Sequence, residues 1–183
     1  MATSAVSAPL AQLPNALTVL RLALIPAFVA VYLRADDGSS WGAGWIFLVA
    51  GVTDQVDGYL ARRWRVESRF GRLADPLADR LMIDAAVILL ALEGKLPWAA
   101  AIVIVARDAL LVGGYRLLMP RDYQLSVSRL GKLATWLLYL SVGILAVTGH
   151  ATEWPLWLFW FALGPALAAA AQYVIKARRE VAA

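Results

Sequence analysis

One stretch of the chain has residue types and spacing that could support catalysis. It opens with two carboxylates, a glycine and an alanine at helical spacing. The stretch begins DQVDGYLAR at Asp54 and continues to Asp79. In a helix, Asp54, Asp57, Gly58 and Ala61 follow the spacing i, i+3, i+4, i+7, so they share one face. This spacing predicts a helix that presents two carboxylates beside a strip of bare backbone.

A second group with helical spacing follows eight residues later. Gly71, Asp75 and Asp79 recur every four residues and share one face of a second helix. Two such helices side by side would aim four carboxylates at one point, where cations must neutralise their mutual repulsion. Oxygen ligands without His or Cys suit Mg²⁺, Mn²⁺ or Ca²⁺. A pair of divalent ions held by shared carboxylates is a common device for displacement at phosphorus.

The composition places this stretch in a membrane protein. The chain has 183 residues, of which 61% are hydrophobic, and its mean hydropathy is +0.66. We expect a single membrane domain over residues 1–183, because the apolar runs are long enough to cross a bilayer. There is no cysteine, and His150 is the only histidine, which excludes disulfides and thiolate sites and disfavours histidine-based zinc sites and Ser-His-Asp triads. In a membrane protein, we interpret the net charge of +4 as a determinant of membrane topology, and we expect no nucleic-acid partner.

Six apolar segments predict an all-α integral membrane protein with six transmembrane helices. Residues 1–13 are expected to be loosely held, and Pro14 to Arg21 forms a short amphipathic lead-in in which Asn15 caps the following helix. The expected spans are 17–33, 41–63, 70–92, 98–118, 128–148 and 154–173.

The placement of Lys and Arg predicts the orientation. These residues gather in the second-to-third and fourth-to-fifth connections and in the C-terminal tail, whereas the other three connections offer only Arg34 and Lys95. Under the positive-inside rule both termini then lie in the cytoplasm. The carboxylates would face the cytoplasmic side of the cell membrane, where nucleotides and magnesium are available.

The neighbours of the carboxylates indicate the substrate class. Gly58 and Ala61 leave the helix backbone open to a flat, bulky group. Arg62, one turn beyond Gly58, is suited to holding phosphate. Together these residues favour an enzyme that acts on a nucleotide-linked or pyrophosphate-linked lipid.

Two other interpretations compete with this one. The aspartates would serve only structure if they formed ion pairs with Arg62, Arg72 and Arg80. Alternatively, the chain would be a divalent-cation transporter, whose carboxylates also bind metal. The glycine and arginine of the motif have no role in a transporter.

The full pattern resembles the signature of the CDP-alcohol phosphatidyltransferases. It reads Asp-x2-Asp-Gly-x2-Ala-Arg-x8-Gly-x3-Asp-x3-Asp, and every fixed position is matched over residues 54–79. The lead-in Asn15-x-Leu17-Thr18-x-x-Arg21 is similar to that of the bacterial glycerophospholipid branch. The resemblance extends over essentially the whole chain.

The resemblance implies transfer of a phosphatidyl group from CDP-diacylglycerol to a hydroxyl, with release of CMP. It also implies two divalent ions, Mg²⁺ or Mn²⁺, as cofactors. By position, Asp54, Asp57 and Asp75 are metal ligands, and Asp79 is a further ligand and the general base. The CDP-lipid contacts implied by position are Asn15, Thr18, Gly58, Ala61, Arg62, Ser68 and Gly71. The resemblance also implies a homodimer.

Two sequence differences among members of the family bear on which alcohol accepts the phosphatidyl group. Arg107-Asp108 resembles the Ala-Arg-Asp segment of cardiolipin synthases, whereas phosphatidylglycerophosphate synthases more often show Ala-Arg-Glu. The chain also lacks the second lysine of Gly-Lys-x-Lys-Thr, with Gly131 to Thr135 reading GKLAT. Both departures favour phosphatidylglycerol as acceptor, giving cardiolipin, over glycerol 3-phosphate. Arg107, Arg129 and Lys132 are the candidates for holding the acceptor's phosphate.

Two further acidic residues lie outside the motif. We expect Asp84 to make a helix–helix hydrogen bond. Asp108 is expected to pair with Arg107 or with a neighbouring helix, so a structural role competes with a catalytic one.

Overall fold

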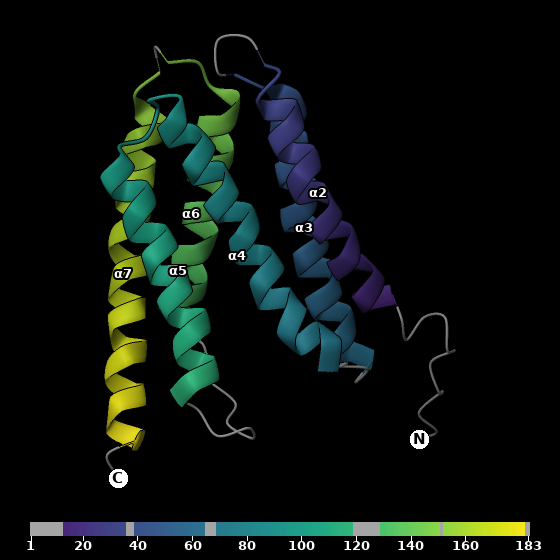
Figure 1. Ribbon diagram of the computed structural model, residues 1–183, viewed down its shortest axis with the longest axis vertical. Coiled ribbons are helices and arrows are strands. Elements are labelled where there is room, and N and C mark those ends of the chain that lie inside the picture. The colour runs from purple at the N-terminus through teal and green to yellow at the C-terminus, as the bar shows by residue number, and fades with distance from the viewer. Residues whose placement is uncertain (1–12, 36–38, 65–68, 119–128, 151, 182–183) are drawn as a thin grey trace.

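The computed structural model describes residues 13–35, 39–64, 69–118, 129–150 and 152–181, and all of its regular structure is helical. Within these ranges there is no strand. The helices are α2 (Leu13–Tyr32), α3 (Trp41–Trp64), α4 (Arg69–Leu92), α5 (Trp98–Leu118), α6 (Arg129–Val147) and α7 (Trp154–Val181) (Figure 1). The all-α prediction is confirmed, and each of the six expected spans corresponds to one helix.

The largest differences from the sequence-based boundaries lie at the two ends of the chain. The expected lead-in is not a separate element, because α2 runs without a break from Leu13 through Arg21 to Tyr32. Asn15 is the third residue of this helix, so the prediction that it caps the helix is wrong. At the other end, α7 extends to Val181 and includes the basic segment that sequence placed in a tail. The expectation for residues 1–13 falls, except for Leu13, outside the described residues.

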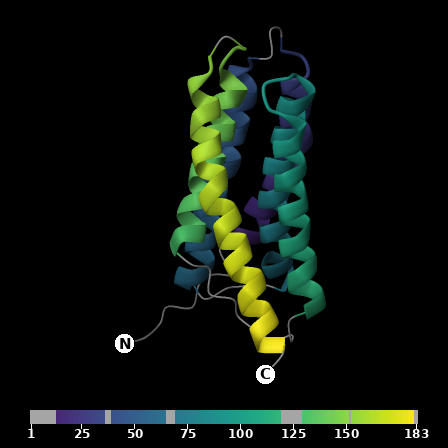
Figure 2. The same cartoon turned by 90° about the vertical axis from the view of Figure 1, so that its left-hand side faces the viewer.

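Successive helices run in alternate directions, so α2 begins and α7 ends at the same end of the bundle (Figure 1). We call this the terminal end and the opposite one the far end. α3 and α5 end, and α4 and α6 begin, at the terminal end. Arg34 and Lys95 lie in connections at the far end. α2 packs on α3 and α4, and α7 packs on α6 and α5, between which it lies in Figure 2.

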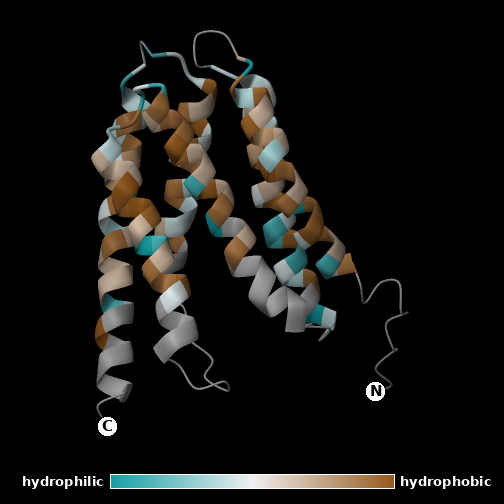
Figure 3. Ribbon diagram, in the orientation of Figure 1, coloured by the Kyte–Doolittle hydropathy of each residue, from teal (hydrophilic) through white to brown (hydrophobic). Residues whose placement is uncertain are grey.

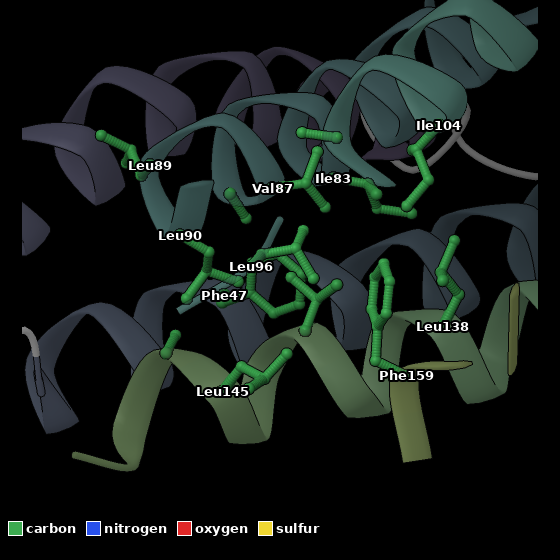
Figure 4. Packing of buried hydrophobic residues seen from close by; sticks show 14 of the residues in the cluster. Phe47, Ile83, Val87, Leu89, Leu90, Leu96, Ile104, Leu138, Leu145 and Phe159 are labelled. Atoms are coloured by element: carbon green, nitrogen blue, oxygen red, sulfur yellow. The ribbon is translucent and has the colours of Figure 1, made fainter. Parts of the chain in front are cut away.

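The core is apolar and is organised around α4, which packs against α2, α3, α5 and α6. Figure 4 shows Ile83, Val87 and Leu90 of α4 facing Phe47 of α3 and Leu138 of α6. All five side chains are buried. Because α4 contacts four other helices, its position is fixed from several sides.

Polar contacts join the helices at the far end. The Tyr32 hydroxyl donates to the Glu93 carboxylate at 3.0 Å, which ties the end of α2 to the turn after α4. Lys95 Nζ donates to the backbone carbonyls of Leu145 and Thr148, at the C-terminus of α6, where a positive charge is favourable. Burial lowers the pKa of Lys95, and the Glu93 carboxylate opposes that shift.

The outer surface of the bundle is strongly apolar. Hydrophobic residues cover much of the helices (Figure 3), and Trp41, Leu110 and Trp157 are 69%, 69% and 72% exposed. Among the described residues, the segments 15–32 of α2 and 154–172 of α7 have the length and apolar composition needed to cross a membrane. α3 and α4 carry the charged motif, which lowers their mean hydropathy.

α3 and α6 approach each other closely beside the motif. A Cβ on Gly51 would lie 2.5 Å from Cε1 of Tyr139, a distance that real Cβ atoms essentially never show. The Tyr139 ring cannot easily move away, because its hydroxyl donates to the Phe47 carbonyl at 2.6 Å and its ring stacks on Phe47 with centroids 4.1 Å apart. Gly51 therefore sets the distance between α3 and α6 one turn before Asp54.

We expect Gly51→Ala to destabilise the protein by about 1–3 kcal/mol, the usual cost of overpacking. That loss corresponds to a fall in Tm of about 2–4 °C per kcal/mol, measured by thermal unfolding in detergent. The matched control is Gly113→Ala in α5, where an added Cβ meets nothing within 4 Å. Equal Tm values for the two variants would contradict the assigned role of Gly51.

Candidate active site

The first two motif aspartates converge on one buried arginine. Arg21 of α2 places Nη1 2.9 Å from Asp54 Oδ1, and its Nη2 donates to Asp57 Oδ2. Asp54 and Asp57 thus lie on the same face of α3, turned toward α2. The side chains of Arg21 and Asp57 are 1% and 2% exposed, and that of Asp54 is 26% exposed. The ion triad opens to its surroundings only at Asp54.

Sequence reasoning did not assign Arg21 this role. The residue was included in the lead-in, and the proposed partners of the aspartates were Arg62, Arg72 and Arg80. The available signal was that Arg21 is the only charged residue of α2. A charge within an apolar helix is costly unless it is paired, so it marks a functional site together with its partner.

Asn15 and Thr18 lie on the same side of α2 as Arg21, at intervals of three residues. Thr18 is buried and Asn15 is half-buried. Gly58 follows Asp57 on α3 and is also half-buried. The proposed nucleotide contacts from α2 and from the start of the motif are therefore on adjacent, packed helices.

The second half of the motif lies on α4, which packs against both α2 and α3. Gly71, Asp75 and Asp79 are helical residues of α4, and Ala61 and Arg62 are helical residues of α3, but their side chains lie outside the described part. Ser68 falls outside the described residues altogether. The structure thus brings the two helices together as predicted and describes the carboxylates of the first half.

Arg80 belongs to a second buried ion cluster, between α4 and α5. Its Nη1 donates to Asp108 Oδ1, which also accepts from Arg107 Nη1 at 2.8 Å. Asp108 and Arg107 are 1% and 8% exposed. The expected pairing of Asp108 with Arg107 is confirmed, and among the described side chains the ion pair of Arg80 is with Asp108.

Three atoms of this second cluster lack a hydrogen-bond partner among the described residues. They are Asp84 Oδ1, Arg107 Nε and Asp108 Oδ2, and all three are buried. The predicted helix–helix hydrogen bond of Asp84 is therefore not found. Buried polar atoms without partners are rare in proteins, and they are expected where a ligand completes the site.

The other two candidates for acceptor binding, Arg129 and Lys132, are at the start of α6, which packs against α3 and α4. Their side chains lie outside the described part. Since α6 begins at the terminal end, both residues are on the same end of the bundle as the second half of the motif.

The described motif carboxylates fit a hard divalent cation. Asp54 and Asp57 offer only oxygen, and Arg21 contacts one oxygen of each. Asp54 Oδ2 also accepts a hydrogen bond from Gln55 Nε2 at 3.2 Å. No group of three or more His, Cys, Asp or Glu residues occurs among the described side chains.

An apolar groove leads to this site along α3 and α6. Its volume is about 530 Å³, and it extends from Trp41 and Val147 at the far end to Gly51 and Trp136. A smaller pocket of about 40 Å³ adjoins it, sharing Gly51 and Trp136 and adding polar atoms of Asp54, Gln55 and Thr135. The groove and the polar pocket together connect an apolar surface to the first carboxylate.

Comparisons with known proteins agree with this geometry. Residues 11–168 match the family model for CDP-alcohol phosphatidyltransferase. A protein of Streptomyces coelicolor named cardiolipin synthase (CMP-forming) is 38% identical over 92% of this chain and 84% of its own length. A Bacillus subtilis protein named CDP-diacylglycerol–glycerol-3-phosphate 3-phosphatidyltransferase is 36% identical over 73% of this chain and 76% of its own length.

A further relative is less completely covered. The Mycobacterium tuberculosis protein, provisionally named a cardiolipin synthase, is 44% identical over 124 residues, which are 67% of this chain and 58% of that protein. The match to the family model covers far more than half of the chain and includes both halves of the motif. The chain belongs to the CDP-alcohol phosphatidyltransferase family.

Proposed function

We propose that the protein transfers a phosphatidyl group from CDP-diacylglycerol to an alcohol, with release of CMP. The observation that carries this proposal is the position of Asp54 and Asp57. They are family-motif carboxylates on one face of α3, held by a buried arginine, and Asp54 lines the small polar pocket that adjoins the apolar groove. A lipid with a charged, nucleotide-linked head needs both an apolar channel and a polar centre.

The membrane placement is part of the proposal. The exposed apolar side chains of the bundle would be covered by lipid, because such extensive apolar surface is unusual on a soluble monomer. All six helices then cross the cell membrane. Both chain ends and the basic terminal end face the cytoplasm, in agreement with the positive-inside rule.

The CDP-diacylglycerol donor would lie between α2, α3 and α4. Its CDP moiety contacts Asn15 and Thr18 of α2, together with the motif residues Gly58, Ala61, Arg62, Ser68 and Gly71. An acyl chain fits the α3–α6 groove, which is almost wholly apolar and reaches the carboxylate end of the site. This arrangement explains why the polar pocket opens toward lipid.

The transfer itself is a displacement at phosphorus. The acceptor oxygen forms a bond to the phosphorus that carries diacylglycerol, and the bond from that phosphorus to the CMP oxygen breaks. Asp79 takes the proton of the acceptor hydroxyl. Asp54, Asp57, Asp75 and Asp79 would hold two ions, Mg²⁺ or Mn²⁺, which would supply positive charge beside the phosphates. Arg62 holds a phosphate of the departing CMP.

The acceptor we favour is phosphatidylglycerol, which gives cardiolipin. The support is the Arg107-Asp108 segment and the printed name of the Streptomyces relative. Glycerol 3-phosphate is the second candidate, supported by the name of the Bacillus relative. Arg107, Arg129 and Lys132 would hold the acceptor's phosphate. A homodimer is the assembly that the family suggests.

An assay with purified protein and CDP-diacylglycerol tests the function. We expect CMP release with Mg²⁺ or Mn²⁺ and phosphatidylglycerol, cardiolipin as product, and loss of activity when EDTA removes the metal. Product formation only with glycerol 3-phosphate would replace the acceptor and leave the chemistry standing. If no acceptor alcohol, including inositol phosphate and serine, supports CMP release, the transporter interpretation takes precedence.

Asp79→Asn is expected to abolish turnover, with a loss of at least about 100-fold, because positioned proton transfer contributes about 10²–10⁴-fold. Binding of CDP-diacylglycerol, measured by calorimetry in the presence of Ca²⁺, should persist. The control is Glu153→Gln, which changes an exposed carboxylate outside the motif, at the far end of the bundle. Loss of donor binding in Asp79→Asn would refute the assignment of Asp79 as base.

Arg107→Gln is expected to raise the KM for the acceptor at least tenfold and to leave the KM for CDP-diacylglycerol nearly unchanged. The reason is that a buried, incompletely hydrogen-bonded guanidinium suits an anionic phosphate. Asp108→Asn is the matched control, because it removes the same ion pair from the other side. Identical changes in KM for the two variants would show that Arg107 only supports the packing of α5.

A further inference from the structure

Arg21 stands where a cation would neutralise the motif. Its guanidinium faces Asp54 Oδ1 and Asp57 Oδ2, and both carboxylates belong to the proposed ligand set. Arginine and the carboxylate it contacts are almost fully buried, at 1% and 2% exposure for Arg21 and Asp57. Arg21 thus brings one positive charge to two carboxylates that lie three residues apart on α3.

The contacts of Arg21 resemble those of a counter-ion more than those of a hydrogen-bonded clamp. Arginine has five N–H donors. Among the described residues, Nε of Arg21 has no hydrogen-bond partner, and Nη1 makes a charge contact with Asp54 that is not aligned as a hydrogen bond. Such an incompletely satisfied guanidinium persists in an apolar helix because the adjacent carboxylates require its charge.

We propose that Arg21 is an internal counter-ion that stabilises the metal-free protein and competes electrostatically with the divalent cation for Asp54 and Asp57. This inference rests on the proposed function, in that it takes the motif carboxylates as cation ligands. A positive charge that already neutralises the carboxylates opposes the arrival of a second one. Arg21 and the bound cation therefore each stabilise the folded protein less when the other is present, as thermodynamic linkage requires.

The proposal has a consequence for the reaction cycle. A site that stays neutralised without metal remains folded and open to cation exchange between turnovers. Cation affinity is then set by α2, which lies outside the motif of α3 and α4. Arg21 is a positioning residue in this scheme, since it acts through the carboxylates and not on the substrate.

Mn²⁺ binding to the purified full chain in detergent tests the proposal, followed by electron paramagnetic resonance and by thermal unfolding. Arg21→Gln should lower the Kd for Mn²⁺ at least tenfold, lower the Tm of the metal-free protein, and enlarge the rise in Tm that Mn²⁺ produces. Arg21→Lys keeps the charge and should remain within about threefold of the wild-type Kd. Arg34→Gln controls for net charge, because Arg34 is exposed and lies about 20 Å further along the direction of α2.

The contrary outcomes are distinct. A higher Kd in Arg21→Gln would overturn the proposal, because loss of an outer-shell partner that orients ligands typically weakens metal binding about 10–100-fold. If Arg21→Gln folds only when Mn²⁺ is present, the proposal is supported. If it fails to fold with and without Mn²⁺, cation and arginine are not interchangeable and the proposal is overturned. Absence of Mn²⁺ binding to the wild-type protein would remove the cation site itself and the inference with it.

Discussion

The structure depends on the requirement that charged side chains inside an apolar bundle be paired. Arg21 and Asp57 are nearly inaccessible, and so are Arg107 and Asp108. Each of the two sets bridges neighbouring helices, the first α2 to α3 and the second α4 to α5. Burying such groups costs several kcal/mol per ion unless partners are supplied, so helix packing and charge placement must agree. α4 belongs to the second set through Arg80, packs against the two helices of the first set, and is held by the apolar core.

Much of the helical framework could be predicted from the sequence. Apolar runs of membrane length, separated by short polar or glycine-containing turns, predicted four of the six helices to within about one residue at each end. The exceptions have local causes. Pro14 is tolerated in the first turn of α2, so the helix begins before the expected span. The basic segment at Lys176 continues α7, because nothing in the sequence up to Val181 breaks the helix.

The partners of the charged residues could not be predicted. Helical periodicity indicates which residues share a face, and it correctly grouped Asp54 with Asp57. It does not indicate which helix that face meets, and Arg21 is 36 residues from Asp57 in sequence. The same limit applies to Arg80, which the sequence offered only as one possible partner of the motif aspartates and whose described partner, Asp108, is on the following helix. Such pairings depend on how helices pack, which is decided by the apolar contacts of the whole bundle.

The α3–α6 groove and the first motif carboxylate lie next to each other, where α3 packs closely against α6. Gly44, Gly51 and Gly143 allow the two helices to come close, and all three line the groove along these helices. Asp54 follows Gly51 by one turn, at the place where the apolar lining gives way to a polar pocket. A water-soluble nucleotide sugar would have no use for the apolar part, and a simple lipid would have no use for the carboxylates. A CDP-linked lipid uses both, and this is the physical reason for preferring it as the substrate of this fold.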